Sequence, residues 1–301
     1  MAKKILITGG SGLVGTALTA LLQHKGYEVA HVSRTESLEG DIKAYSWDSL
    51  SGKKAEEALS DLRAVVHLAG AGIADSRWTN SRKKVIIDSR VKTAETLFDA
   101  CQRTGLWPDA FISASGINYY GSVTSEKIFT ESDSPSDSFI GECCVLWEDA
   151  AKKFEASCRV AMLRTGVVLA KEGGALPRIA APVKLGAGAA LGSGKQYMPY
   201  IHIDDLAAMY LYAIEKEAVR GPYNAVNGDH ITNAGLTKAI AQTLDKPLWL
   251  PNVPGFVLKL ALGELSEVLL EGSRASDDKI RSTGYKPTFG NVDAALRDIY
   301  R

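Results

Sequence analysis

Three regularly spaced glycines are the first residues of this chain that could do chemistry. Gly9, Gly12 and Gly15 follow the apolar run 4–8 at G-x-x-G-x-x-G spacing, and a segment with helical periodicity comes directly after them. In a strand–turn–helix unit such glycines permit a sharp turn, close approach of a pyrophosphate and tight helix–sheet packing, while the helix N-terminus supplies free N–H groups. A tight turn with accidental glycines is the alternative. The position after the first strand favours a nucleotide site.

The end of the second apolar run indicates which nucleotide. Sites for NAD usually place an aspartate or glutamate here to hold the ribose 2′-hydroxyl. This run ends with Ser33 and Arg34, and no acid occurs before Glu36. An arginine can pair with a 2′-phosphate, and a serine hydroxyl can add a hydrogen bond. A solvated arginine in a surface loop is the alternative reading, but the pattern favours NADP(H).

The elements that must position these residues alternate along the chain. Short runs that are apolar nearly throughout, typical of strands covered on both faces, occupy 4–8, 28–33, 64–69, 110–115 and 160–169. Longer segments with helical spacing lie between them. The clearest is 80–104, whose predicted apolar face consists of Ile87, Val91, Ala94, Phe98 and Cys101. This alternation predicts an α/β fold with a Rossmann-like, doubly wound parallel sheet.

The pattern changes after residue 170. The stretch 172–196 is rich in glycine and reads as a short helix followed by loops, and helical material is expected from 203 to about 271, with a short strand at 222–226. We therefore expect an NADP-binding Rossmann domain at 1–170, to which part of 198–230 returns. Residues 171–301 would form a smaller, interleaved α/β lobe that carries the substrate side or a lid.

Composition excludes several classes of function. Lysine plus arginine and aspartate plus glutamate each total 35, so the formal charge is zero. Whole-surface electrostatics therefore gives no reason to bind nucleic acid or an anionic membrane. The four cysteines form no CxxC pair and no zinc-ligand spacing, which predicts no metal site. No apolar run is long enough for a signal peptide or a membrane span, so a cytoplasmic location is expected.

Longer sequence blocks resemble a known superfamily. The segments TGGSGLVG (8–15) and HLAGAG (67–72) are similar to the cofactor motifs of extended short-chain dehydrogenases/reductases. More narrowly, the chain resembles the atypical, YfcH-type epimerase family proteins, which are NAD(P)-dependent epimerase/dehydratase-like. The matching blocks are VSRT (32–35), HLAGAGIADSRW (67–78), SASGINYYG (113–121), LRTGVVLAKEGGAL (163–176), LGSGKQYMPYIHIDDLA (191–207) and LALGELSEVLLEGSR (260–274).

The resemblance implies a set of cofactor contacts, position by position. It places NADP(H) against Gly9, Ser11, Gly12, Leu13, Val14, Ser33, Arg34, Leu68, Ala69, Gly70, Arg90 and Val168. Members of the superfamily also use a tyrosine and, four residues later on the same helix, a lysine to move a proton. Ser115 matches the serine that holds the substrate oxygen. The tyrosine–lysine pair is absent: by register Cys143 and Trp147 stand in its place.

Other groups must then supply the proton, if one moves. Tyr119 is a candidate, with Tyr120, Tyr200 and His202 as further possibilities. Each tyrosine could equally belong to the core or a cleft wall, and His202 could be a hydrogen-bonded link between lobes. On the substrate side, we expect contacts from a cation and an aromatic ring at Arg77 and Trp78, and from Tyr200 and His202.

Two functions remain open. The first is an NADP(H)-dependent oxidoreductase or epimerase-like enzyme that acts on an unidentified small molecule. The second, favoured by the missing tyrosine–lysine pair, is an NADP(H)-binding sensor or regulatory protein without turnover. In both cases we expect a monomer or homodimer with no nucleic-acid or membrane partner.

Overall fold

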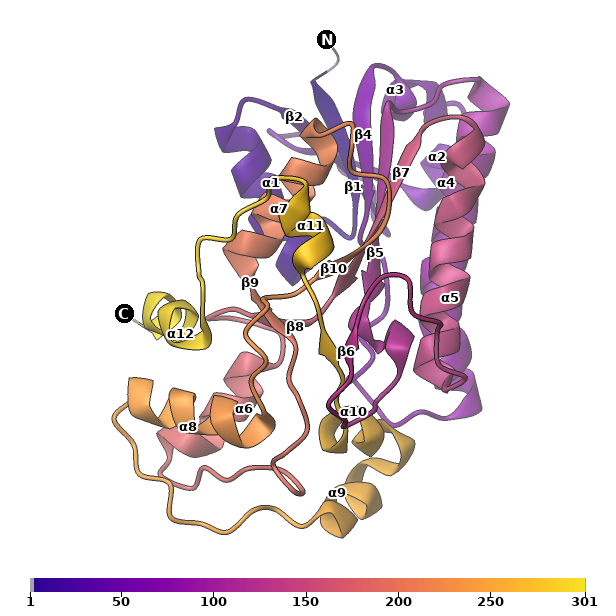
Figure 1. Ribbon diagram of the computed structural model, residues 1–301. Coiled ribbons are helices and arrows are strands. Elements are labelled where there is room, and N and C mark those ends of the chain that lie inside the picture. The colour runs from indigo at the N-terminus through magenta and orange to yellow at the C-terminus, as the bar shows by residue number, and fades with distance from the viewer. Residues whose placement is uncertain (1–2, 301) are drawn as a thin grey trace.

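A seven-stranded parallel sheet forms the centre of the protein in a computed structural model that describes residues 3–300 (Figure 1). The strand order is β10-β7-β5-β4-β1-β2-β3. Their bounds are β1 Lys4–Thr8, β2 Glu28–Ser33, β3 Lys43–Ser46, β4 Leu62–His67, β5 Ala110–Gly116, β7 Arg159–Thr165 and β10 Gly221–Ala225. From β1 the chain continues outward through β2 and β3, and it then returns to the other side of β1 to form β4. The switch point therefore lies between β1 and β4, and a doubly wound sheet binds its ligand at such a point. The predicted fold class is confirmed.

Helices cover both faces of this sheet. One face packs α1 (Leu13–His24), α7 (Ile203–Glu215) and α11 (Asp278–Ser282) against alternate strand residues such as Ile5 and Ile7. The other face packs α2 (Trp47–Ser51), α3 (Ala55–Leu59), α4 (Asn80–Thr104) and α5 (Phe139–Lys152) against the intervening residues such as Leu6. Burial on both faces explains why the strands read as apolar throughout.

A smaller lobe lies beyond the carboxyl ends of the strands (Figure 1). It contains α6 (Leu176–Lys184), α8 (Asn233–Thr243), α9 (Gly255–Leu262), α10 (Glu267–Leu270), α12 (Val292–Tyr300) and the 3-10 helix η3 (Gly263–Ser266). Two small parallel ladders connect it to the main body: β8 (Val167–Leu169) with β9 (Tyr200–His202), and β6 (Ile128–Phe129) with β11 (Arg274–Ala275). Outside this lobe, the 3-10 helix η2 (Lys153–Ala156) directly follows α5 and precedes β7.

Three details correct the sequence-based expectations. The run 160–169 is two strands, β7 and β8, because the chain leaves the main sheet at Gly166. There it passes so close to Pro199 that a Cβ atom would lie 2.5 Å from the Pro199 carbonyl oxygen. The buried stripe of α4 includes Ile86, Arg90 and Leu97 rather than Ile87, Val91 and Phe98, which are half-buried. The helical material predicted up to 271 is interrupted at 244–254, where three prolines prevent helix continuation.

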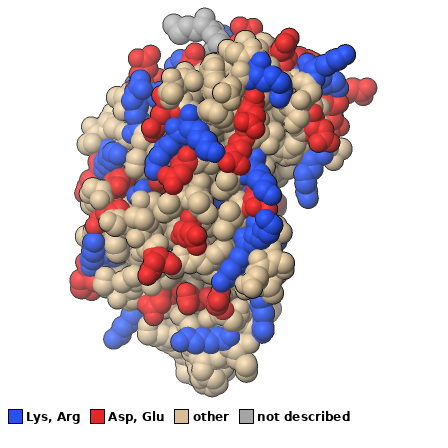
Figure 2. Space-filling view, turned by 90° about the vertical axis from the view of Figure 1, so that its right-hand side faces the viewer, with Lys and Arg blue, Asp and Glu red and all other residues tan. Residues whose placement is uncertain are grey.

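Charged side chains are mixed on the face that carries α4 and α5. Figure 2 shows acidic and basic groups interspersed there, and several form exposed ion pairs, including Lys84 and Lys92 with Asp88 and Lys153 with Glu95. Such a face offers no continuous basic stripe for a nucleic acid. Within residues 3–300, no helix combines the length and the apolar character needed to cross a membrane.

Candidate functional site: an open edge and a filled catalytic position

The turn between β1 and α1 leaves a bare helix N-terminus at the carboxyl edge of the sheet. Gly9 has φ +70°, and a side chain there would lie 3.0 Å from the backbone of Leu68. Gly12 is the N-cap of α1 in an extended conformation, so no side chain caps the first helical N–H groups. Ser11 and Gly12 are exposed, and Leu13 and Val14 begin the helix. Uncapped N–H groups and the positive end of a helix dipole together fit a pyrophosphate.

The loop after β4 is fixed beside this turn by a buried threonine. Thr8 Oγ1 accepts hydrogen bonds from the backbone N–H groups of Leu68 (3.1 Å) and Ala69 (3.0 Å). With both acceptor positions used, its proton goes to His67 Nδ1 at 2.9 Å, and His67 Nε2 then donates to the carbonyl oxygen of Arg90 at 3.1 Å. Burial lowers the pKa of His67 to about 4, so the ring stays neutral. The predicted contacts Leu68 and Ala69 are thus held in one place.

Arg90 lies directly behind this loop. It is 8% exposed, its Nη1 donates to the carbonyl oxygens of Ala71 and Ile86, and its guanidinium sits over the ring of Trp147 at 4.8 Å. A side chain at Gly70 would come within 2.9 Å of Arg90 Cζ, so the glycine allows this approach. The predicted residue Arg90 therefore lies at the same edge of the sheet, packed against Gly70 and Ala71.

The remaining predicted cofactor residues flank the turn. Ser33 ends β2, and its hydroxyl donates a hydrogen bond to the carbonyl oxygen of Thr35. Arg34 follows as an exposed side chain that makes no ion pair with any residue between 3 and 300. On the other side, the carbonyl of Val168 and the side chain of Leu13 both lie close to Gly174. The structure brings these residues to one edge, as the sequence predicts, and their contacts with a cofactor stay a prediction.

Ser115 has a different environment, because its hydroxyl is part of a buried polar network. Ser115 Oγ donates to Glu148 Oε1 at 2.8 Å. Arg164 binds the same carboxylate through two bonds, Nε to Oε1 at 2.7 Å and Nη2 to Oε2 at 2.8 Å. All three residues are at most 4% exposed. Glu148 Oε1 accepts from both Ser115 and Arg164, so the serine proton is committed to this carboxylate.

Arg164 also organises the two tyrosines that follow β5 in the 3-10 helix η1 (Ile117–Tyr120). Its Nη1 donates to the hydroxyl of Tyr120 at 2.9 Å, and that hydroxyl donates to Asn224 Oδ1 at 2.8 Å. The guanidinium lies 3.4 Å from the ring centre of Tyr119, which is half-buried. Although burial disfavours its charge, the hydrogen bonds that it donates to Glu148 raise the pKa of Arg164. Tyr119 is thus held on a permanent cation beside Ser115.

The positions where the tyrosine–lysine pair would stand are filled by core residues. Cys143 is 1% exposed, and burial raises its pKa, so it holds its proton more tightly than a free thiol. Trp147 is 8% exposed and packs edge-on to His67. Its indole N–H is buried and has no hydrogen-bond partner among residues 3–300. Neither side chain offers a mobile proton.

Two of the predicted substrate residues lie inside the smaller-lobe junction. Tyr200 is fully buried and donates to Asp229 Oδ2 at 2.9 Å. His202 is 2% exposed, caps α7 by accepting the backbone N–H of Asp204 at Nδ1, and faces Asp298 Oδ2 with Nε2 at 3.4 Å. These contacts correspond to the alternative of a link between lobes. Although His202, Asp204 and Asp298 are close enough to share an ion, the lone pair of Nδ1 is already used by the helix cap.

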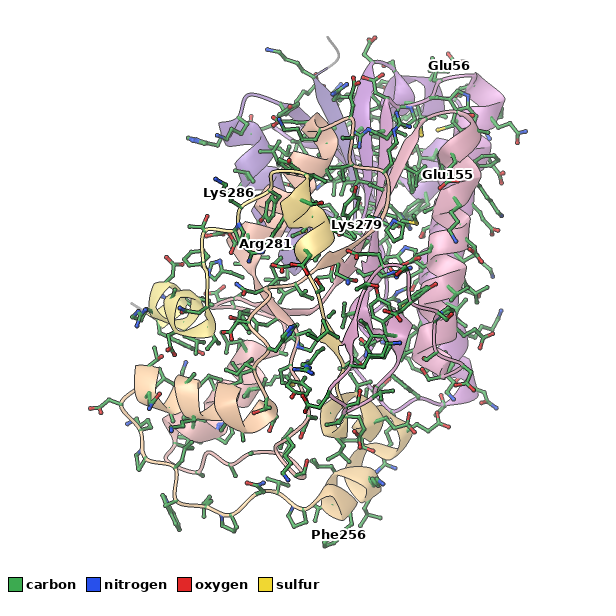
Figure 3. The ribbon with its side chains drawn as sticks, in the orientation of Figure 1. Glu56, Glu155, Phe256, Lys279, Arg281 and Lys286 are labelled. Atoms are coloured by element: carbon green, nitrogen blue, oxygen red, sulfur yellow. The ribbon has the colours of Figure 1, made fainter. Side chains whose placement is uncertain are left out.

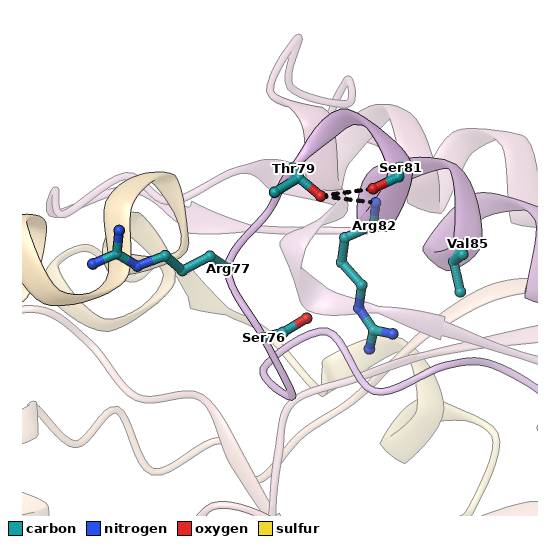
Figure 4. Close-up of a pocket in the computed structure, with 6 residues that line it drawn as sticks. All are labelled: Ser76, Arg77, Thr79, Ser81, Arg82 and Val85. Carbon is teal, nitrogen blue, oxygen red and sulfur yellow. Dashed lines mark hydrogen bonds between the residues drawn. The ribbon is translucent and has the colours of Figure 1, made fainter.

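The other two lie in the loop between β4 and α4. Trp78 Nε1 donates to the carbonyl of Ile73 at 2.8 Å, and Arg77 donates to two carbonyls of α9. Beside them is an open depression of about 420 Å³ (Figure 4), lined by Ser76, Arg77, Thr79, Ser81, Arg82 and Val85. A role in substrate binding for any of the four stays a prediction.

The sequence reasoning missed the partners that define these two regions. Glu148 and Arg164 were not singled out, nor were Thr8 and His67. One signal was available: Arg164 directly follows the apolar run 160–163 inside a strand, and a buried charge requires a partner. Glu148 lies on the buried face of α5 next to Trp147, which indicates the same need.

The parallel sheet, the glycine turn and the loop after β4 together define a Rossmann-type nucleotide-binding protein of the extended short-chain dehydrogenase class. A family model described as the NAD dependent epimerase/dehydratase family matches residues 5–227, and a domain of unknown function, DUF1731, matches residues 253–299. The chain belongs to the NAD-dependent epimerase/dehydratase family. The recognition made from sequence blocks is confirmed.

Three similar proteins indicate how far the likeness extends. Epimerase family protein SDR39U1 of Mus musculus is 35% identical over 299 residues, which cover 98% of this chain and 99% of that protein. The crystal structure of human SDR39U1 (isoform 2) with NADPH has a TM-score of 0.90 and 32% identity, and covers 99% of both chains. A nucleoside-diphosphate sugar epimerase from Corynebacterium glutamicum has a TM-score of 0.80 and 30% identity, and the match covers all of this chain and 58% of that one.

Proposed function

We propose that this chain binds NADP(H) across the carboxyl edge of its sheet. The observation that carries the proposal is the uncapped N-terminus of α1, which opens beside a loop whose position is fixed by Thr8. Gly12 adds no side chain between this helix end and a pyrophosphate. The likeness to human SDR39U1, whose structure contains NADPH, supports the same assignment.

Each part of the edge has a task in this proposal. The N–H groups of Leu13 and Val14 bind the pyrophosphate, and Arg34 with Ser33 binds the 2′-phosphate. The loop Leu68–Gly70, with Arg90 and Val168, borders the nicotinamide half. Bound NADP(H) supplies or accepts a hydride, so the residues nearest Ser115 decide whether a reaction follows.

We further propose that the protein is an oxidoreductase or epimerase-like enzyme acting on a small molecule. Because the proton of Ser115 is committed to Glu148, Ser115 Oγ is left to accept a hydrogen bond from a substrate hydroxyl. Tyr119, half-buried and stacked on Arg164, is the phenol placed to give or take the proton.

A specific observation favours the second candidate, an NADP(H)-binding regulatory protein. Cys143 and Trp147 fill the positions of the usual proton-transfer pair, and both are buried. In this candidate, the network around Glu148 stabilises the fold and has no role in turnover. The two candidates share the cofactor and differ only in whether the cofactor changes its redox state.

Titration calorimetry of cofactor-stripped protein tests the shared part. We expect NADPH to bind more tightly than NADH, and Arg34→Ala to lose about 1–3 kcal/mol of NADPH affinity, as for a hydrogen bond to a charged group. The variant should leave NADH affinity unchanged. Arg297→Ala, which removes an exposed arginine of α12, is the matched control. Equal affinities for NADPH and NADH in the wild type would contradict the assignment of Arg34.

Turnover tests separate the two candidates. NADPH oxidation across a panel of carbonyl compounds, and NADP⁺ reduction across the matching alcohols, should be measured for wild type, Ser115→Ala and Tyr119→Phe. The enzyme proposal predicts a wild-type rate that falls by roughly 10²–10⁴ in Tyr119→Phe, the range of a lost general acid. Absence of turnover in the wild type across both panels would favour the regulatory candidate, whereas equal, measurable rates in all three proteins would contradict the roles given to Ser115 and Tyr119.

A further inference from the structure

Helix α9 lies at the surface of the smaller lobe. None of its eight residues is buried, and two of its apolar side chains, Phe256 and Leu260, are 72% and 80% exposed. Phe256 projects from the end of the molecule farthest from the sheet (Figure 3). Segments with few buried apolar contacts open locally at low free energy. The position of α9 therefore depends on the few polar contacts that hold it.

Two of these contacts come from the loop between β4 and α4 and the first turn of α4. Arg77 donates to the last carbonyl groups of α9, from Nε to Ala261 at 2.8 Å and from Nη2 to Leu260 at 2.7 Å. Lys83 pairs with Glu264, just beyond the helix, at 2.5 Å. Figure 4 shows Arg77 directed away from Arg82 and toward a neighbouring helix. The final carbonyls of a helix have no partner within it, so an arginine there stabilises the helix end.

The same loop begins at the predicted cofactor contacts. Its first residues, Leu68 and Ala69, are bonded to Thr8, and Ala71 is bonded at N–H to Ser89 and at its carbonyl to Arg90. One end of the segment 68–79 therefore lies at the cofactor edge, and Arg77 near its other end holds α9. The segment is a continuous physical connection between the two lobes.

We propose that Arg77 is a positioning residue that transmits cofactor occupancy to α9. The inference rests on the NADP(H) binding proposed above. Residues 68–71 are already held by Thr8, Ser89 and Arg90. A cofactor seated on Leu68–Gly70 therefore restricts the remaining residues of the segment, 72–79, and through Arg77 this restriction stabilises α9. The cofactor itself need not touch α9, because ordering of a shared segment is sufficient for coupling. The substrate side is then completed only when NADP(H) is bound.

Hydrogen–deuterium exchange with saturating NADPH tests this coupling. In the wild type, we expect exchange in peptides that span 255–266 to slow roughly fivefold or more, the range of ordinary coupling between sites. In Arg77→Ala, peptides covering 9–14 should still be protected by NADPH, whereas α9 should lose the effect. Arg77→Gln, which keeps one donor, should retain part of it. Lys84→Ala removes a neighbouring cation whose one ion pair among residues 3–300 is with Asp88, and it should behave as the wild type.

Each outcome decides the matter. Slowing of α9 that persists unchanged in both Arg77 variants would overturn the role of Arg77. Wild-type protein that binds NADPH in calorimetry without any slowing at α9 would overturn the coupling and leave the proposed function intact. Absence of NADPH binding would refute the proposed function itself, and the inference with it.

Discussion

The proposed cofactor edge and the proposed catalytic position lie at the same end of the sheet but are built in opposite ways. At the cofactor edge, Ser11, Gly12 and Arg34 are exposed, and the groups offered to a ligand are mostly backbone N–H groups. Around Ser115, the side chains are buried and bonded to one another, with Glu148 and Arg164 each 2% exposed. The first region leaves the N-terminal N–H groups of α1 without a side-chain cap, whereas the second satisfies its own polar atoms.

The difference teaches that cofactor binding and proton transfer are separable in this fold. In the proposed binding mode, NADP(H) needs the bare N-terminus of α1, a fixed loop and one cation, and α5 contributes only the Trp147 ring that packs on His67 and Arg90 behind that loop. Proton transfer needs a titratable group that is accessible, and α5 presents Cys143 and Trp147 in the core instead. A chain can therefore keep the first property while the second moves to another residue or is lost.

The largest effect should come from removing one partner of the buried ion pair. Glu148→Ala leaves Arg164 charged and unpaired in the core, which costs about 3–5 kcal/mol in the free energy of unfolding. Urea denaturation followed by circular dichroism measures it. Asp149→Ala, next in sequence, removes an exposed pair with Lys152 and should cost less than about 1 kcal/mol. Equal small losses in the two variants would show that the buried network contributes little.

A slightly smaller effect should appear in the pH dependence of the unfolding free energy, because His67 titrates differently in the folded and unfolded chain. The pKa of its ring is about 4 in the folded protein and near 6.5 when unfolded, because burial disfavours the charged form. Between these values the unfolded chain binds the extra proton. The contribution of the neutral His67 ring to the unfolding free energy is therefore fully present above about pH 6.5, and this contribution falls by up to about 3 kcal/mol as the pH drops to 4. His67→Gln does not titrate, so the wild-type-minus-variant difference in unfolding free energy should show this dependence. A flat difference would contradict a neutral, buried His67.

The smallest effect should separate ligand binding from folding at the glycine turn. Gly12 has φ −78°, and an added Cβ would meet only the carbonyl oxygen of Gly9 at 3.2 Å. Gly12→Ala should therefore change the unfolding free energy by less than about 1 kcal/mol, whereas NADPH affinity should fall about tenfold, or about 1.4 kcal/mol, because the methyl group meets the pyrophosphate. Gly52→Ala, an exposed glycine with φ −114° and only ordinary contacts, is the control. Unchanged affinity in Gly12→Ala would place the pyrophosphate elsewhere.

The cofactor edge could be predicted from sequence because its determinants are local. The glycine spacing, the apolar strand before it and the residues that end β2 all fall within one βαβ unit, where period and turn chemistry are readable. The parallel sheet follows from the alternation of apolar runs and helices. The contacts that anchor the loop after β4 are less visible, since Thr8 and His67 are about 60 positions apart.

The filled catalytic position could not be predicted because its members come from distant elements. Ser115, Glu148 and Arg164 lie on β5, α5 and β7, and no local pattern links them. Glu148 follows Trp147 on α5, and its residue type alone does not indicate that it is buried against β5 and β7. Tyr200 and His202 illustrate the converse: polar types in a matching block predicted substrate contacts, and the β8–β9 ladder buries both, which no local pattern indicates. Their substrate role stays a prediction.

A crystal structure of the wild-type protein grown with NADPH tests the contrast between the two regions most directly. We predict the pyrophosphate at the N-terminus of α1, the 2′-phosphate at Arg34 and the nicotinamide half beside Leu68–Gly70, with Glu148 still bonded to Arg164 and Trp147 still in the core. A cofactor bound away from α1, or a Glu148 carboxylate turned from Arg164 toward the nicotinamide, would contradict it.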